Sequence, residues 1–170
     1  ISPGSTITGF PPCIITGQLH TADVVSDTAQ MDLRTAYDSL QGLPCPPANI
    51  VSGNLGGTTK TAGVWCSAIG FGVTGTLTLD GGGDSTSTFV FQAGSSLITA
   101  GSIVLINGAQ AKNVYWAVGS SATLGTASHW QGNILALTSI TLNDDATLIG
   151  RALARNGSVS LGSNNFVTLP

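Results

Sequence analysis

The chain has 170 residues and a mass of 17.1 kDa, which fits a single domain. Only 8% of its residues are charged, against roughly 25% in ordinary soluble domains, and all eight acidic residues are Asp. Five Lys and Arg residues are too few to neutralise a nucleic-acid backbone, and a chain without Glu lacks the pattern of a coiled coil. No apolar run approaches the roughly 18 residues that a membrane helix needs. We therefore expect neither nucleic-acid binding nor membrane insertion.

Small residues dominate the composition instead. Gly, Thr and Ser together fill more than a third of the chain, and 42% of all residues are hydrophobic. Disorder is excluded because these hydrophobic residues are numerous and alternate with polar ones. The composition predicts a folded protein whose surface is neutral and built from hydroxyl groups and small side chains.

Residues 21–42 carry the only helical pattern. One stripe of residues recurs at spacings of three and four: Ala29, Leu33, Ala36, Tyr37 and Leu40. Asp27 or Thr28 can cap the start, and Gly42 stands where an αL residue normally closes a helix, just before three prolines. A single helix cannot bury its stripe alone, so we expect it to lie against the rest of the domain.

From residue 50 onward the hydrophobic pattern has period two, in short strands punctuated by Gly, Asn and Asp. Similar strands recur about every 20 residues, at 76–81, 96–101, 121–125, 139–143 and 158–162. A second strand recurs in step at 115–118, 134–137 and 152–154. Such repeats indicate a solenoid, in which each coil packs on the next. A sandwich also has many short strands, but it does not require them to resemble one another, so we favour a β-solenoid.

Alternation sorts each repeated strand into core and surface positions. The predicted inward residues are Leu77, Leu79, Ala122, Leu124, Ile140, Leu142, Val159 and Leu161. The predicted outward residues are Thr76, Thr78, Ser96, Ile98, Ser121, Thr123, Ser139, Thr141, Ser158 and Ser160. Because stacked strands lie about 4.8 Å apart, the outward residues predict a flat, two-column lattice of hydroxyl and methyl groups on one rigid face.

Motifs for catalysis or cofactor binding are weak. The glycines of 70–75 match a dinucleotide-binding pattern, but a strand follows instead of a helix, so we interpret them as a solenoid corner. Asp144 and Asp145 with Arg151 and Arg155 come nearest to a sugar-cleaving cluster, and we interpret them as turn aspartates and a solvated salt pair. Other motifs fit turns and the surface better than chemistry: isolated His20 and His129, the glycine-rich 80–84 and the sequon 156–158. We therefore expect no enzymatic activity, no cofactor and no metal.

Three cysteines leave at least one unpaired. Cys45 and Cys66 are 21 residues apart, close to one coil, so stacking could bring them within bonding distance. A bond between Cys13 and Cys45 across the helical segment is the rival pairing, and three buried thiols are the third possibility. Either bond would imply an oxidising compartment.

Seven segments in order resemble one family: 1–11 (ISPGSTITGFP), 53–57 (GNLGG), 74–80 (TGTLTLD), 104–110 (VLINGAQ), 118–126 (VGSSATLGT), 134–143 (ILALTSITLN) and 150–157 (GRALARNG). The resemblance extends over nearly the whole chain. The sequence is similar to the DUF3494 ice-binding (antifreeze) proteins of cold-adapted microbes.

The resemblance implies one domain over 1–170, a right-handed, three-faced, discontinuous β-solenoid with a long α-helix packed along its side. Residues 13–48 correspond to the family's helical capping insertion and 49–170 to the coils. The segment that forms the first coil in relatives is missing before residue 1, so we expect one end of the solenoid to lack a coil unless another part of the protein supplies it. Lys112 stands where many relatives have Cys, so the disulfide of those relatives cannot form here.

The resemblance also implies a function. One flat β-face would adsorb to an ice crystal surface and inhibit its growth and recrystallisation, which gives thermal hysteresis, without catalysis or cofactor. The ten outward residues form our candidate for that face. We expect a secreted monomer, and the alternative is an extracellular polysaccharide-binding or adhesin module.

Overall fold

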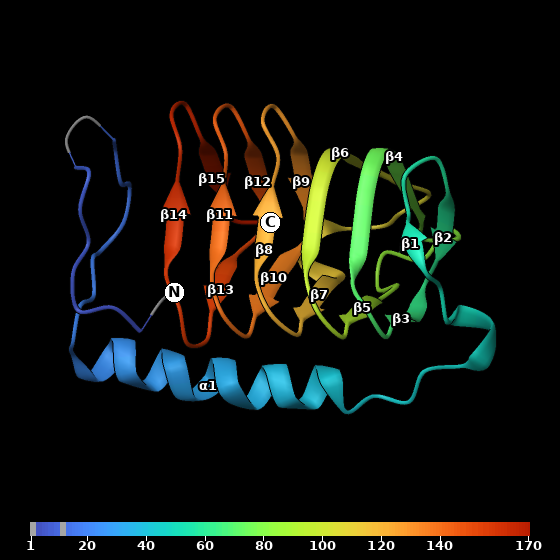
Figure 1. Cartoon of the computed structure of the whole chain (residues 1–170), viewed down its shortest axis with the longest axis horizontal. Helices are drawn as coiled ribbons and strands as arrows, with labels where there is room; N and C mark the ends of the chain where they lie inside the picture. The colour runs from blue at the N-terminus through green and yellow to red at the C-terminus, as the bar shows by residue number, and fades with distance from the viewer. Residues whose placement is uncertain (1–2, 11–12) are drawn as a thin grey trace.

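One helix lies along a stack of short parallel strands in the computed structural model (Figure 1). The structure describes residues 3–10 and 13–170, so Ile1, Ser2 and Pro11 of the first family motif lie outside the described residues. The helix is α1 (Val24–Gln41), and two short 3₁₀ turns lie at Pro47–Asn49 and Ala111–Asn113. The predicted β-solenoid with one helix is confirmed.

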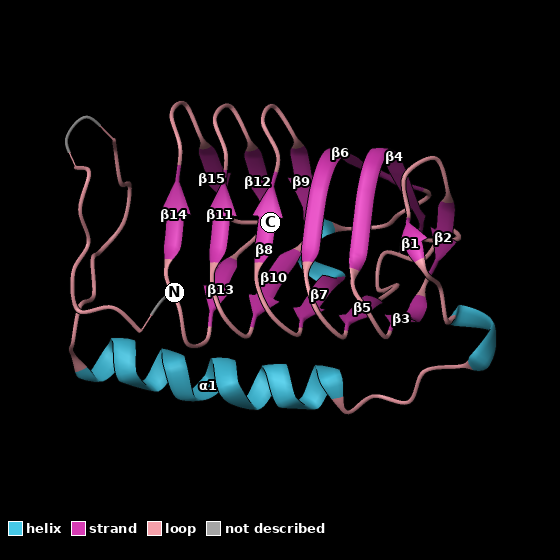
Figure 2. Ribbon diagram, in the orientation of Figure 1, coloured by secondary structure: helices cyan, strands magenta, loops and turns pink. Residues whose placement is uncertain are grey.

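The strands form three faces around a common core (Figure 2). The helix face consists of β3 (Gly63–Ser67), β5 (Phe89–Ala93), β7 (Val114–Val118), β10 (Asn133–Ala136) and β13 (Ala152–Ala154). The threonine–serine face consists of β1 (Gly53–Asn54), β8 (Ala122–Leu124), β11 (Ile140–Leu142), β14 (Val159–Leu161) and the first halves of β4 (Phe71–Asp80) and β6 (Leu97–Ile106). The second face consists of β2 (Thr59–Thr61), β9 (His129–Gln131), β12 (Thr147–Ile149), β15 (Phe166–Thr168) and the second halves of β4 and β6.

The long strands β4 and β6 run across the corner between two faces. The first half of β6 pairs with β8 and its second half with β9, which are separate strands on different faces. At the corner, Gly75 lies in register with Gly101 and has a φ of +90°, which L-residues with side chains rarely adopt. A Cβ atom at position 101 would also collide with the carbonyl oxygen of Gly75. Of the glycines in 70–75, Gly75 therefore forms the predicted corner, whereas Gly72 lies within the strand.

Aromatic side chains fill the centre of the solenoid. The rings of Phe91 and Trp116 stack with centroids 4.0 Å apart, and Trp130 follows 4.8 Å from Trp116. Phe71 meets Phe91 edge-on at 5.9 Å. The inward residues predicted from alternation surround these rings and are buried, except in the last coil, where Val159 is only partly buried and Leu161 is 47% exposed. No strand of the described chain pairs with the outer edge of β14, which explains that exposure.

Helix α1 packs on the helix face through the predicted stripe, with three corrections. Leu33 and Tyr37 are buried against Leu135, but Ala36 is exposed. The N-cap is Asp23, whose carboxylate accepts a hydrogen bond from the N–H of Ser26 at 2.8 Å, so the prediction of Asp27 or Thr28 is wrong. Gly42 does end the helix, but in the αR conformation (φ −82°, ψ −6°) rather than αL.

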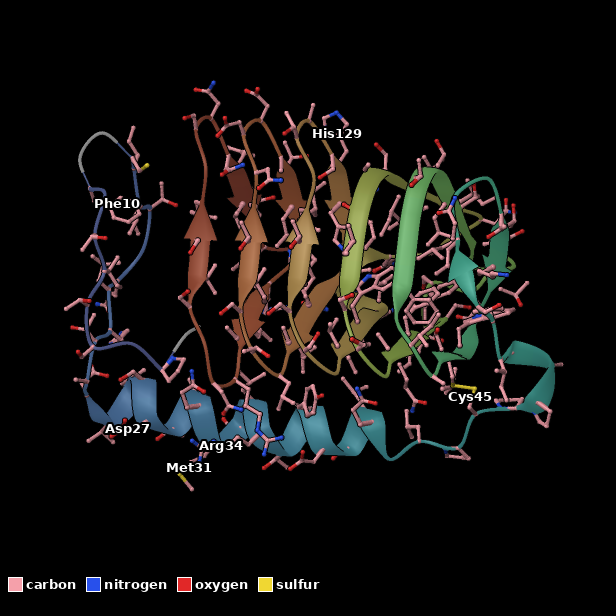
Figure 3. All side chains as sticks on the ribbon, viewed as in Figure 1. Phe10, Asp27, Met31, Arg34, Cys45 and His129 are labelled. Atoms are coloured by element: carbon pink, nitrogen blue, oxygen red, sulfur yellow. A yellow bond between two sulfur atoms is a disulfide. The ribbon has the colours of Figure 1, made fainter. Side chains whose placement is uncertain are left out.

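The outer side of α1 faces solvent, and Figure 3 shows Met31 and Arg34 pointing away from the strands. At the other end of α1, the structure contains a disulfide between Cys45 and Cys66, which joins the segment after the helix to β3 (Figure 3). Cys13 is free and exposed.

Gln92 on β5 holds the end of α1 in place. Its side-chain amide donates to the carbonyl oxygens of Leu40 at 2.6 Å and Leu43 at 2.9 Å. We expect Gln92→Leu to lower the free energy of unfolding by about 1–3 kcal/mol, because both carbonyls lose the hydrogen bond from the Gln92 amide at a partly buried site. Urea unfolding followed by circular dichroism measures this effect. Gln18→Leu in the exposed N-terminal segment is the control, and an equal loss there would contradict the role of Gln92.

Candidate functional site

The threonine–serine face carries a straight column of outward side chains. Parallel pairing places Ile98, Thr123, Thr141 and Ser160 directly in register on four successive coils. Gly72 and then Asn54 continue the same column toward the first coil. The inward neighbours on β8 and β11 are fully buried, so packing fixes the direction of the outward residues. Ile98 is 60% exposed and contributes only methyl and methylene groups to the column.

A second column lies where each coil enters this face. It consists of the predicted residues Ser96, Ser121, Ser139 and Ser158. The hydroxyl oxygen of Ser121 accepts the N–H of Ser139 at 3.3 Å, and that of Ser139 accepts the N–H of Ser158 at 3.2 Å. Because the backbone holds these two hydroxyl oxygens, their positions repeat from coil to coil.

The prediction that all ten residues share one face is wrong for Thr76 and Thr78. Both lie after the corner on the second half of β4, where Thr76 is in register with Ser102 and Thr78 with Val104. Thr59 of β2 is the neighbour of Thr78 on the other side. These two threonines therefore belong to the second face, and the other eight predicted residues belong to the threonine–serine face.

The second face differs in chemistry. Its columns include His129, the charged Asp80 and the 65% exposed ring of Phe166. The N–H of Gly82 and then the side-chain amide of Asn107 donate to Asp80 and hold the pKa of its carboxyl below the ordinary value. His129 is hydrogen-bonded through Nδ1 to the hydroxyl of Thr147 at 2.8 Å. The two columns of the threonine–serine face carry no ionisable group, so this face is the more uniform surface.

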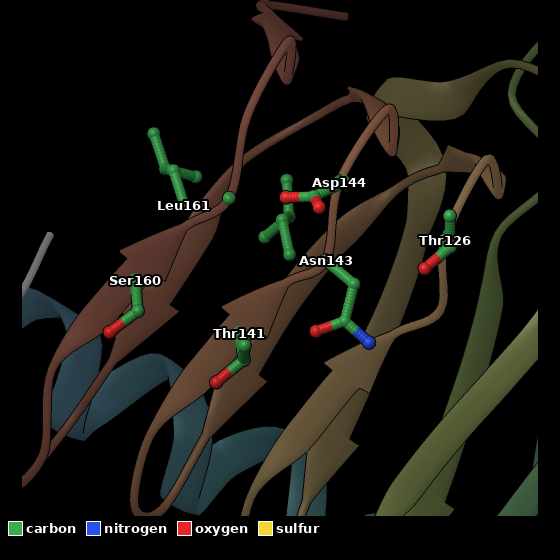
Figure 4. Close-up of a pocket in the computed structure, with 8 residues that line it drawn as sticks. Thr126, Thr141, Asn143, Asp144, Ser160 and Leu161 are labelled. Carbon is green, nitrogen blue, oxygen red and sulfur yellow. The ribbon is translucent and has the colours of Figure 1, made fainter.

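A shallow groove of about 320 Å³ lies at the edge of the threonine–serine face (Figure 4). Thr141, Ser160 and Leu161 line it from the strands of the face, and Asn143 and Asp144 line it from the adjoining corner. Asp144 accepts a hydrogen bond from the N–H of Ser163 at 2.7 Å. A pair of carboxylates, which sugar cleavage requires, is not present among the residues lining this groove.

The predicted salt pair of Asp144 and Asp145 with the nearby arginines is also corrected. Asp145 accepts from Asn164 at 3.1 Å, Arg151 donates to Asn133 at 2.9 Å, and Arg155 pairs instead with Asp38 of the helix at 2.7 Å.

The described ranges 3–10 and 13–170 contain no group of three or more His, Cys or acidic side chains that could hold a metal ion. Within these same ranges, no helix combines the length and the hydrophobicity that crossing a bilayer requires.

Sequence reasoning missed the first-coil part of the threonine–serine face, which contains Asn54, Gly72 and Thr74. Asn54 accepts the N–H of Thr74 at 2.7 Å, which ties the two outermost coils together. The signal that could have found them is the segment Phe71-Gly72-Val73. It aligns with Leu97-Ile98-Thr99, but Gly72 conceals the period-two pattern.

The sequence model of the Ice-binding-like family matches residues 1–167. An ice-binding protein of Nostoc sp. (strain HG1) is 49% identical over 167 residues, which cover 96% of this chain and 61% of that protein. Ice-binding protein 1 of Shewanella frigidimarina is 36% identical over 160 residues, 91% of this chain and 18% of that protein. This chain thus spans less than two thirds of either relative.

Solved structures of ice-binding proteins also resemble this fold. The crystal structure of an ice-binding protein from the Antarctic ascomycete Antarctomyces psychrotrophicus superposes with a TM-score of 0.94 at 46% sequence identity, over 99% of this chain and 83% of that one. A match over nearly the full length in both sequence and structure establishes the relationship. The chain belongs to the Ice-binding-like family.

Proposed function

We propose that this protein binds ice through the threonine–serine face and so inhibits ice growth and recrystallisation. The observation that carries the proposal is the in-register column of Ile98, Thr123, Thr141 and Ser160, flanked by the serine column, on a family member whose relatives are named for ice binding. Adsorption to a crystal plane needs a flat, repeating surface, and parallel strands about 4.8 Å apart supply one.

Rigidity and neutrality favour this face over the other two. Helix α1 covers the helix face, and the second face carries a charged carboxylate and a protruding aromatic ring. A face fixed by a fully buried core loses little conformational entropy on binding. Uncharged hydroxyl and methyl groups hold surface water less tightly than ions do, so that water can adopt the arrangement of the crystal.

In this proposal, the protein acts without catalysis or cofactor, as a monomer, outside the cell. The disulfide between Cys45 and Cys66 supports an oxidising compartment. Neither the family nor the relatives supports the alternative of a polysaccharide-binding or adhesin module.

Ice crystals grown in a solution of the purified chain test the proposal directly. We expect faceted crystals, a gap between the melting and freezing temperatures, and slower recrystallisation than in buffer. An unfolded sample of the same chain is the control and should have none of these effects. Round crystals that grow freely at every protein concentration would contradict the proposal.

A further inference from the structure

The solenoid has an end, formed by β1, β2 and β3 and called the β1–β3 end below, where the outer edges of β1 and β2 have no strand partner. Within the described chain, β1 and β2 pair only with β4. The outer edge of β3 is partly covered, because the N–H of Val51 donates to Cys66 and the amide of Asn49 donates to Val64. Unpaired strand edges readily pair with another chain unless something prevents it.

Lys60 is the one charged side chain in this coil, and it points toward the core. It lies in register with Leu79, which is fully buried, and it is half-buried although its neighbours Thr59 and Thr61 are exposed. Its Nζ atom sits 4.4 Å from the centroid of the Trp65 ring. Trp65 is itself in register with the buried Phe91, so the indole is the last layer of the core and the lysine covers it.

The ammonium group of Lys60 depends on solvent to stabilise its charge at this position. Neither of the salt bridges between described residues involves Lys60, so no carboxylate compensates its charge. The cation–π contact with Trp65 holds the side chain over the ring while the charge keeps its access to solvent. A second chain packed on this end would strip that water away, and burying an unpaired charge is strongly unfavourable.

At the opposite end, the outermost strands β14 and β15 contain no charged residue. Leu161 and Val167, in the outermost strands β14 and β15, are 47% and 43% exposed. The segment that leads into α1 extends past β14 on that side (Figure 1), which hinders head-to-tail stacking of whole molecules. Two molecules could therefore stack end to end only through their β1–β3 ends. Such a contact would bring two Lys60 side chains together.

We propose that Lys60 keeps the β1–β3 end from pairing with the same end of a second copy of this chain. Inward-pointing charges are a known means by which edge strands avoid association. Without the charge, two such ends meet around a two-fold axis and form a closed dimer.

Replacing Lys60 with Met tests this proposal. Met keeps an unbranched stem and a favourable contact with the Trp65 ring but removes the charge. In sedimentation equilibrium, we expect the mass of Lys60→Met to rise with concentration from the 17.1 kDa of one chain toward twice that value. Lys60→Gln should also associate, whereas Lys60→Arg and the wild type should remain at the mass of one chain.

A second substitution locates the contact. Adding Leu161→Lys at the opposite end should leave the Lys60→Met dimer unchanged. Two results would overturn the proposal: folded Lys60→Met and Lys60→Gln proteins that keep the mass of one chain at every concentration, or association that Leu161→Lys abolishes. Circular dichroism establishes that each variant is folded.

Discussion

Replacing Thr141 with Tyr should abolish most of the inhibition of ice growth, and the same change at Thr78 should leave it close to wild type. Thr141 lies within the in-register column, between Thr123 and Ser160. A phenol ring there would stand above a surface of small side chains and hold the face away from a flat crystal plane. Thr78 lies beyond the corner on the second face, so a ring there would not touch ice bound to the threonine–serine face.

The two variants form a matched pair. Both threonines are half-buried, and both are flanked in sequence by fully buried inward residues. The two substitutions should therefore lower the free energy of unfolding by similar amounts. Thermal hysteresis and recrystallisation inhibition measure activity, and thermal unfolding shows whether the fold is intact. Loss of activity in a folded Thr78→Tyr protein, with Thr141→Tyr active, would mean that the second face binds ice.

The error over Thr76 and Thr78 shows what alternation can and cannot predict. Leu77 and Leu79 were correctly expected to point inward, because the two faces share one core and the period of two continues across the corner. The face to which an outward residue belongs depends on where the chain bends, and in β4 the bend is at Gly75. Two strands with similar amino-acid sequences can therefore lie on different faces of the solenoid.

The stacking of aromatic rings at the centre of the core could not be predicted from the hydrophobic pattern of any single strand. Phe91, Trp116 and Trp130 come from three coils, and their stacking depends on the register between strands. The helix stripe, in contrast, follows from spacing within one element, and of its residues only Ala36 is exposed. The N-cap was missed although Asp23 and Ser26 form a reciprocal capping pair, a signal that lies in the sequence itself.

Removing the disulfide should cause a large loss of stability. Cys45 and Cys66 close a loop with a sequence separation of 21, and a bond of that span stabilises a fold by about 3 kcal/mol through the entropy of the unfolded chain. A domain of this size has only about 5–15 kcal/mol of net stability, so the loss is a substantial part of the total. We expect the double variant Cys45→Ser/Cys66→Ser to unfold at a clearly lower urea concentration than the wild type.

Cys13→Ser is the matched control, because Cys13 is exposed and free and its removal should leave the urea midpoint unchanged. Reductant should lower the midpoint of the wild type and of Cys13→Ser but not that of the double variant. A loss of stability in Cys13→Ser equal to that of the double variant would instead favour the rival pairing of Cys13 with Cys45. The bond joins the segment after α1 to β3 on the helix face, away from the threonine–serine face. Below its unfolding temperature, the double variant should therefore still inhibit ice growth, which separates the stability of the solenoid from the chemistry of the binding surface.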